Sequence, residues 1–169
     1  MTDPKPLTMN PEPLAAGVAQ RIGALGIALP TPSKPVAAYV PVVEAGGMAF
    51  VSGQIPFDTN GQPMLGRIGE DRDLDYGKAA ARACGLMVLA QLQAALGSLD
   101  RVERVVKLGV FVNSDARFTD QPKVADGASQ LMVDVFGDAG KHARAAVGVP
   151  TLPLGVAVEV DAVVSLKSA

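Results

Sequence analysis

The chain contains little of the chemistry that marks a metal site or a disulfide-stabilised fold: one cysteine, one histidine and no tryptophan among 169 residues. The single cysteine, Cys84, cannot form an intramolecular disulfide, which fits a reducing compartment, so we expect a cytoplasmic protein. Because Cys and His do not cluster, no zinc site is expected. The amino-terminal segment lacks an apolar run followed by a cleavage-like site, so no secretion signal is predicted.

An excess of charge of one sign is also missing, since 15 Lys and Arg face 17 Asp and Glu, for a net charge of −2. This balance provides no basic field for phosphate groups, and an aromatic content of 4% offers little for base stacking, so nucleic acid is not an expected partner. The mean hydropathy of +0.26 is high. Charged or amide residues such as Arg82, Gln91 and Gln93 nevertheless interrupt the long apolar stretches. We interpret the apolar excess as a core and a subunit interface, and expect no membrane span.

The amino-terminal part of the chain is predicted to be an appendage of a single domain. Apolar residues recur at helical spacing between residues 14 and 25, so a short amphipathic helix is predicted over residues 13–25. Residues 30–35 hold three prolines, which is typical of an extended connector. We therefore divide the chain into an N-terminal extension, residues 1–35, and a main domain, residues 36–169.

The main domain alternates between strand-like and helix-like apolar patterns. The predicted order is β-β-α-β-α-β-β, with strands over residues 39–43, 48–55, 102–112, 143–149 and 157–166, and helices over residues 75–96 and from the N-cap Asp120 to Phe136. This order indicates an α+β fold, a mixed sheet with the two main helices on one face. The other face must be covered, and self-association is the simplest way to cover it.

Alternation along the last two strands places one arginine and two carboxylates. Arg144 shares a face with Ala146 and Gly148, so its guanidinium is flanked by small groups and needs an anionic partner. Glu159 and Asp161 fall on the face opposite to the core. If the two strands pair antiparallel around residues 150–153, Arg144 and Glu159 come into facing register. Such a pair is either a functional site or a structural ion pair, and the latter is the commoner case.

An ordered set of short motifs resembles the RidA/YjgF family, also labelled endoribonuclease L-PSP. The set comprises VSGQIP at residues 51–56, VFV at 110–112, AR at 143–144 with Val147 and Val149, and EVDA at 159–162. The resemblance extends from about residue 39 to residue 166. It implies a chorismate-mutase-like fold, a homotrimer and ligand clefts at the subunit interfaces. It also implies hydrolysis of reactive enamine and imine intermediates, such as 2-aminoacrylate, to 2-keto acids and ammonia.

By this resemblance five residues line the cleft: Tyr39, Ser52, Gly53, Arg144 and Glu159. Arg144 would clamp the substrate carboxylate with two parallel hydrogen bonds, and Glu159 would orient or deprotonate the attacking water. Tyr39 would supply a phenolic hydrogen bond, while Ser52 and Gly53 would shape the polar end of the pocket. An iminium carbon is already electrophilic, so no metal, cofactor or covalent nucleophile is required.

The chain departs from the family pattern at several positions. Ala37-Ala38 stands where Gly-Pro usually precedes the tyrosine, Ala146 stands where a cysteine often follows the arginine, and Gly148 replaces a common glutamate. With the N-terminal extension and a longer segment around residues 121–129, these features resemble a distinct, longer subgroup. Its substrate need not be the familiar one.

Two other function classes stay open. A non-catalytic, regulatory trimer that binds 2-keto acids would also retain Arg144, and the older family label implies a ribonuclease, which the charge and the aromatic content disfavour. Three further residues have two interpretations each. His142 lies either at the pocket mouth or in an exposed loop, and Asp126 and Ser129 either line the cleft or lie on a solvated helical face.

Overall fold

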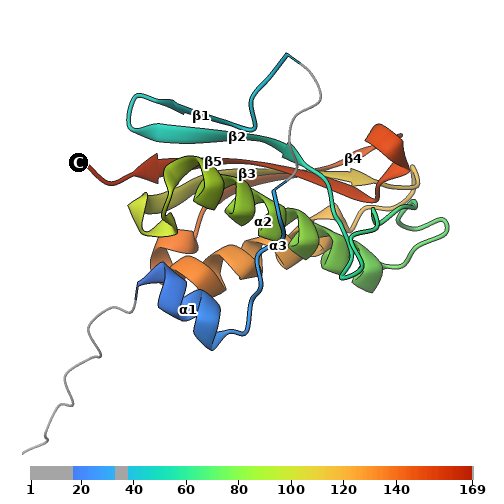
Figure 1. Cartoon of the computed structure of the whole chain (residues 1–169). Helices are drawn as coiled ribbons and strands as arrows, with labels where there is room; N and C mark the ends of the chain where they lie inside the picture. The colour runs from blue at the N-terminus through green and yellow to red at the C-terminus, as the bar shows by residue number, and fades with distance from the viewer. Residues whose placement is uncertain (1–16, 33–37, 169) are drawn as a thin grey trace, which may run out of the picture.

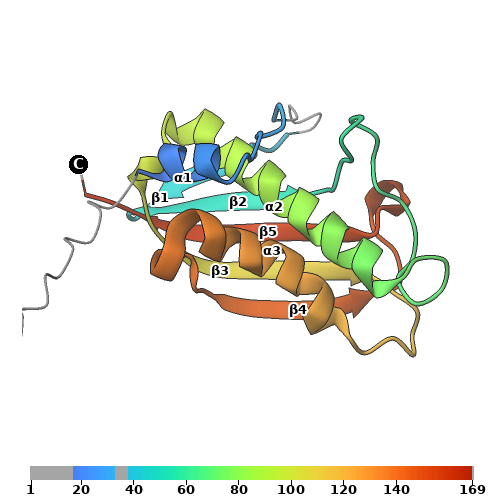
Figure 2. The ribbon, with the colours of Figure 1, turned by 90° about the horizontal axis from the view of Figure 1, so that it is seen from below.

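Two long helices cover one face of a five-stranded sheet in the computed structural model, which describes residues 17–32 and 38–168 (Figures 1 and 2). The predicted β-β-α-β-α-β-β order and fold class are confirmed, with a short first helix before them. The elements are α1 (Val18–Ala24), β1 (Val42–Ala45), β2 (Met48–Gln54), α2 (Leu74–Leu96), β3 (Val102–Asn113), α3 (Gln121–Phe136), β4 (Ala143–Val149) and β5 (Val158–Leu166). The bounds of the first strand differ most from the prediction, since the strand is predicted over residues 39–43 and observed over Val42–Ala45.

The strand order is β1-β2-β5-β3-β4. β1 and β2 form a hairpin through Gly46 and Gly47, which both have positive φ, as a tight two-residue turn requires. β4 runs parallel to β3 because α3 provides the crossover that a parallel pair needs. β5 pairs antiparallel with β2 on one side and with β3 on the other. The expected pairing of the last two strands is therefore wrong, because β3 lies between them.

Alternating side chains of the central strands form the sheet side of the hydrophobic core. In β5 every second residue is at most 2% exposed, and the corresponding residues of β3 are as deeply buried. These side chains pack against α2 and α3. The set comprises Val158, Val160, Ala162 and Val164 of β5 with Leu108, Val110 and Val112 of β3. The predicted faces of β5 are thus confirmed, with Glu159 and Asp161 on the side away from the helices.

Within the described part of the chain, α2 is the one helix that is long and apolar enough to cross a membrane by length and composition. Of the segment that meets this criterion, 61% is buried inside the protein. Cys84 and Leu89, for example, are fully buried in the hydrophobic core. This burial is that of a core helix. The helix begins after Asp73, whose side chain accepts the backbone N–H of Tyr76 at 2.8 Å.

α2 and α3 cross so closely that glycine is required at the crossing. A Cβ atom on Gly127 of α3 would overlap the backbone carbonyl of Lys78 in α2. A Cβ on Gly85 of α2 would lie 2.9 Å from a methyl carbon of Leu131. A backbone carbonyl moves only with its helix, so Gly127 sets the distance between the two helices. The crossing also fixes which face of α3 meets β4.

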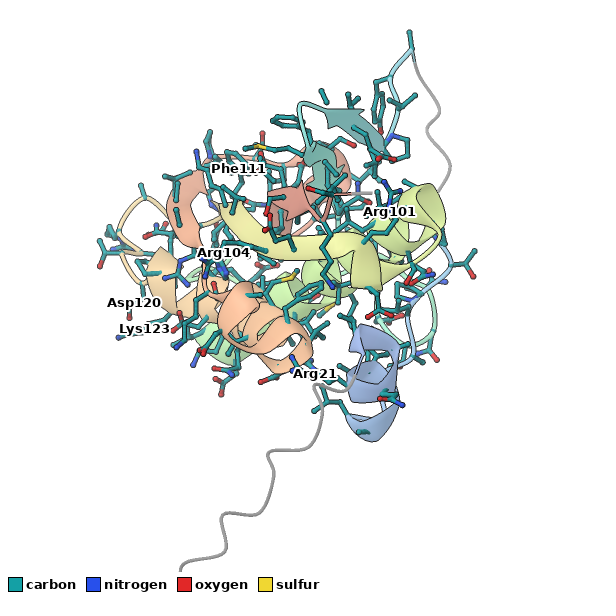
Figure 3. All side chains as sticks on the ribbon, turned by 90° about the vertical axis from the view of Figure 1, so that its left-hand side faces the viewer. Arg21, Arg101, Arg104, Phe111, Asp120 and Lys123 are labelled. Atoms are coloured by element: carbon teal, nitrogen blue, oxygen red, sulfur yellow. The ribbon has the colours of Figure 1, made fainter. Side chains whose placement is uncertain are left out.

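The N-terminal helix packs against the main domain near the end of α3. It was predicted over residues 13–25; residues 13–16 lie outside the described residues, and the observed helix is Val18–Ala24. The backbone N–H of Val18 donates to Asp100 Oδ1 at 2.7 Å, and Ile22 packs against the core. Arg21 lies beside Gly137, where α3 ends (Figure 3), so its charge lies near the negative end of the α3 dipole. Residues 33–35 of the predicted connector also lie outside the described residues.

The sheet face opposite the helices exposes large apolar side chains. Val43, Phe50 and Val147 are 47%, 45% and 45% exposed, and Met48 is 37% exposed. Phe111 of β3 lies on this face as well, away from α3 (Figure 3). An apolar sheet face of this extent is typical of a surface that is buried by another protein molecule.

Gly127→Ala is expected to lower the free energy of unfolding by about 2 kcal/mol, because overpacking a tight contact costs ~1–3 kcal/mol. Urea unfolding measures this change. The matched control is Gly23→Ala in α1, where an added Cβ meets no atom within 4 Å. There we expect no loss of stability, since alanine is the better helix former. Equal losses for the two variants would contradict a close α2–α3 crossing.

Candidate functional site

The Ser-Gly pair of the 51–56 motif lies in an irregularity of β2. The register of β2 against β5 shifts between Val51 and Gln54, which places Ser52 and Gly53 in a bulge. The buried side chain of Gln54 donates to the Ser52 carbonyl oxygen at 2.9 Å and accepts from Gln91 of α2 at 3.3 Å. Gln54 therefore holds the bulge in shape. Gln54 belongs to the sequence motif, but its role in holding the bulge depends on its burial, which the sequence alone does not show.

Glu159 lies directly against the backbone of Gly53. A Cβ atom on Gly53 would overlap the Glu159 carboxylate, so only glycine allows this approach. The partly buried Glu159 side chain faces away from the helices, on the apolar face that carries Phe111. Ser52 and Gly53 therefore share with Glu159 a small polar region on a largely apolar surface. The structure thus brings together three of the five predicted site residues.

Burial raises the pKa of Glu159 above its ordinary value of 4.5, and the neighbouring charge of Asp161 raises it further. Asp161 is held in place by the backbone N–H of Gly109, which donates to its Oδ1 atom at 3.0 Å. A carboxylate that resists ionisation next to an open apolar surface is poised to accept a proton. Cys84, on the core side of the sheet, is a poor candidate nucleophile, because burial raises the pKa of its thiol.

The Ser52 side chain contacts the segment that follows Tyr39. The Ser52 hydroxyl donates to the Pro41 carbonyl at 3.1 Å, which ties β2 to the segment just before β1. Tyr39 precedes Pro41 by two residues and is 53% exposed. Among residues 17–32 and 38–168 its hydroxyl has no hydrogen-bond partner in this structure.

Arg144 lies on the edge strand β4 and faces α3. Its Nη1 atom donates to Asp126 Oδ1 at 2.9 Å and to Ser129 Oγ at 3.1 Å. The Arg144 side chain is 24% exposed, whereas that of Asp126 is 60% exposed. The predicted anionic partner is thus Asp126 rather than Glu159. Asp126 and Ser129 were given two interpretations from the sequence, and the structure places both against the arginine.

Arg144 and Glu159 do not meet within one chain. Arg144 is in register with Leu108 of β3, and Glu159 with Phe111, three residues further along. Two interstrand spacings and three residues of strand rise separate their Cα atoms by roughly 14 Å. Their side chains also point to opposite faces of the sheet, so the expected facing register is wrong. The local reason is that β3 occupies the position beside β4 that β5 was expected to fill.

Two polar side chains lie close to Gly148, the position where the family resemblance implies a glutamate. A Cβ atom there would lie 2.7 Å from both Gln121 Nε2 and Ser114 Oγ. These polar groups and Arg67 line a cavity of about 320 Å³ at the ends of β3 and β4. A glutamate side chain at residue 148 would enter space that Gln121 and Ser114 occupy.

Another cavity lies elsewhere, between residues 28–31, residues 57–61 and α2. Its volume is about 640 Å³, and Leu29, Phe57, Leu86 and Met87 form apolar walls. None of the predicted site residues lines it. In the described residues no three side chains of His, Cys, Asp or Glu are grouped so as to hold a metal ion.

Known proteins match this chain over most of its length. Residues 19–165 match the family described as "YjgF/chorismate_mutase-like, putative endoribonuclease". Protein TCP17 of Trypanosoma cruzi is 53% identical over 152 residues, which is 89% of this chain and 95% of that protein. A Shewanella oneidensis structure with the same endoribonuclease description is 32% identical, covering 89% of this chain and 100% of that one, with a TM-score of 0.85. The structure of Escherichia coli TdcF with bound serine is 26% identical, covering 82% and 94%, with a TM-score of 0.58.

The family match covers more than half of the chain, and the sheet order, the two-helix layer and the motif positions fit it. The chain therefore belongs to the YjgF/chorismate-mutase-like family, the RidA/YjgF family that its motifs resemble.

Proposed function

We propose that this protein hydrolyses reactive enamine and imine intermediates, such as 2-aminoacrylate or 2-imino acids, to 2-keto acids and ammonia. The observation that carries the proposal is the partly buried Glu159 carboxylate with its raised pKa, set against Gly53 on an otherwise apolar sheet face. Such a group is a stronger proton acceptor than an ordinary carboxylate. Arg144 supplies the complementary charge for a substrate carboxylate.

The active cleft forms, in this proposal, between copies of the chain in a homotrimer. One chain carries Arg144 and Glu159 on opposite faces of its sheet, so a small substrate contacts both only where two copies meet. The exposed apolar face with Phe50 and Val147 supports such an association. Arg144 on the edge strand of one subunit would then lie beside Glu159 of a partner subunit.

The reaction needs only positioning and one proton acceptor. Arg144 holds the substrate carboxylate with two hydrogen bonds, which orients the electrophilic iminium carbon. Glu159 takes a proton from water as the water oxygen bonds to that carbon. In the resulting carbinolamine Glu159 returns that proton to the nitrogen, and the C–N bond breaks as the hydroxyl oxygen forms the C=O double bond. The hydroxyl proton leaves with the nitrogen, so the products are the 2-keto acid and ammonium. Tyr39 and the Ser52–Gly53 bulge hydrogen-bond and shape the polar end of the cleft.

Binding without turnover is the second candidate function. TdcF, a similar structure, holds serine, a small molecule with a carboxylate. In the present chain Arg144 alone could bind such a molecule, because its anchoring partners come from its own subunit. A ribonuclease, which the family description names, has less support, since the net charge is −2 and the aromatic content 4%.

Arg144→Ala is expected to lower kcat/KM for 2-imino acid hydrolysis about a hundredfold, because two charge-assisted hydrogen bonds are lost. Arg144→Lys should recover only a small part, since lysine cannot bind bidentately. Release of 2-keto acid and ammonia from enzymatically generated 2-aminoacrylate is the measurement. Arg82→Ala is the control, because Arg82 of α2 pairs with Asp134 and not with a partner of Arg144. No acceleration by a folded wild type that binds keto acids would favour the binding function.

The rate should fall as pH decreases through the raised pKa of Glu159, since only the carboxylate accepts a proton. Glu159→Gln should abolish this acidic limb and lower kcat by about 10² to 10⁴. A pH–rate profile of both proteins tests the role. An unchanged limb in the variant would assign the base to another residue.

Stability gives a second readout of the same carboxylate. Below its ordinary pKa Glu159 is protonated in both the folded and the unfolded state, so it does not lower the free energy of unfolding. As pH rises through the raised folded-state pKa, ionisation destabilises the folded protein. Glu159→Gln should therefore stabilise the protein at pH 8 and have little effect on stability at pH 4, as measured by urea unfolding.

Phe50→Glu is expected to dissociate the trimer into folded monomers, because it places a charge on the apolar face that would be buried. Sedimentation velocity measures the dissociation, and circular dichroism shows that the monomers are folded. Leu25→Glu is the control, since Leu25 is similarly exposed, at 49%, but follows α1 on the helical side. A trimer that tolerates glutamate at residue 50 would place the subunit interface elsewhere.

A further inference from the structure

A chain of hydrogen bonds runs inward from Arg144 through three residues of the same subunit. Ser129 Oγ, which accepts from Arg144, lies 2.9 Å from His142 Nε2. The other ring nitrogen, Nδ1, contacts the Gly140 carbonyl oxygen. α3 contributes Ser129, and the turn before β4 contributes His142. The order is therefore Arg144, Ser129, His142 and the Gly140 carbonyl.

The direction of each bond follows from the chemistry of its ends. A carbonyl oxygen only accepts, so His142 Nδ1 carries a hydrogen and donates to Gly140. In the neutral ring Nε2 is then an acceptor, and the Ser129 hydroxyl donates to it. The Ser129 oxygen is left to accept from Arg144. Gly140 thus orients the His142 ring, the ring orients the Ser129 hydroxyl, and Ser129 fixes the side of the guanidinium that faces α3.

Asp126 binds the same guanidinium from its outer side. Its carboxylate is 60% exposed, while the Arg144 side chain is 24% exposed, so Asp126 caps a group more buried than itself. The contact is to Nη1 alone. Among residues 17–32 and 38–168, neither Nη2 nor Nε of Arg144 donates a hydrogen bond in this structure. An incoming carboxylate can therefore bind two guanidinium nitrogens where Asp126 binds one, and bidentate pairs are the stronger ones.

We propose that Asp126 is a built-in competitor for the carboxylate site on Arg144, and that Ser129 and His142 are positioning residues that hold the guanidinium when a ligand displaces Asp126. This rests on the proposed function, in which Arg144 anchors the substrate carboxylate. The device selects anions, because a neutral ligand gains too little from the guanidinium to displace a carboxylate. It also sets a threshold affinity, since every ligand must replace an existing ion pair.

The competing explanation is that Asp126 and Arg144 form a structural ion pair joining α3 to β4. The two explanations predict opposite effects of Asp126→Asn on ligand binding. Removal of a competitor tightens binding, whereas loss of a structural tie leaves it unchanged or weakens it. Asp134→Asn is the matched control, because Asp134 is also an α3 carboxylate paired with an arginine, Arg82.

Calorimetric titration with pyruvate tests the proposal on the full-length protein, with pyruvamide as the uncharged probe of similar shape. Asp126→Asn should bind pyruvate about three- to fivefold more tightly, in keeping with the modest strength of an exposed ion pair. Asp134→Asn should match wild type, and neither substitution should create pyruvamide binding. Ser129→Ala should bind pyruvate about fivefold more weakly, and Ser129→Thr, which keeps the hydroxyl, should recover most of that loss.

His142 provides a readout that a structural role would not move, because it is the only histidine in the sequence. In protein with ¹⁵N-labelled histidine, spectra taken where the ring is neutral should show Nδ1 as the protonated nitrogen, because it donates to Gly140. Pyruvate should shift the Nε2 signal in wild type through the Arg144–Ser129 bond, and should not shift it in Ser129→Ala. A constant Nε2 signal in wild type saturated with pyruvate would overturn the positioning role of Ser129 and His142.

The remaining outcomes separate this inference from the proposed function. If the protein deaminates 2-imino acids but Asp126→Asn does not bind pyruvate more tightly, the inference fails and the proposed function stands. If Asp126→Asn binds more tightly and no variant shows turnover, the inference stands and the deaminase fails. If neither wild type nor Asp126→Asn binds pyruvate, the inference fails whatever the turnover. Circular dichroism identifies a misfolded variant, and Asp126→Ala then replaces Asp126→Asn in the same titration.

Discussion

β3 separates the two strands that carry the charged site residues, and successive side chains of a strand point to opposite faces of the sheet. Arg144 therefore lies on the face covered by α3, whereas Glu159 lies on the open face. No change of rotamer within one chain brings the two together. The separation explains why one face has a finished network of hydrogen bonds and the other has a carboxylate beside exposed apolar side chains. In the proposed function, a second copy of the chain therefore supplies the other half of the site.

α3 links the stability of the fold to the state of the arginine. Gly127 faces α2 at the tight crossing, and its neighbour Asp126 binds Arg144 on β4. Ser129, two residues beyond Gly127, lies on the same β4 side as Asp126. Because one turn of helix serves both contacts, a shift of α3 relative to α2 moves the partners of Arg144. The glycine that permits close helix packing thus also contributes to the geometry of the site.

Local patterns predicted the elements well because apolar period and turn residues act over a few positions. The period-two run of residues 157–166 gave both the strand β5 and its buried face correctly. Strand order could not be predicted in the same way, since the short segment of residues 150–157 resembles a hairpin loop yet connects strands on either side of β3. The predicted pairing of Arg144 with Glu159 is wrong for this reason. His142, Ser129 and Asp126 were noticed in the sequence, but only their distances distinguish a network from three unrelated polar residues.

The arrangement lets binding and catalysis change independently. Everything that holds Arg144 comes from its own subunit, so a carboxylate site can persist in a chain that has lost the base on the other face. Conversely, the raised pKa of Glu159 arises from burial and from Asp161, neither of which involves Arg144. Gly148 lies beside neither half, because the space next to it is filled by Gln121 and Ser114. In the proposed function the same fold therefore binds a carboxylate ligand through Arg144 in either case, and it acts as a hydrolase only where Glu159 of another copy supplies the base.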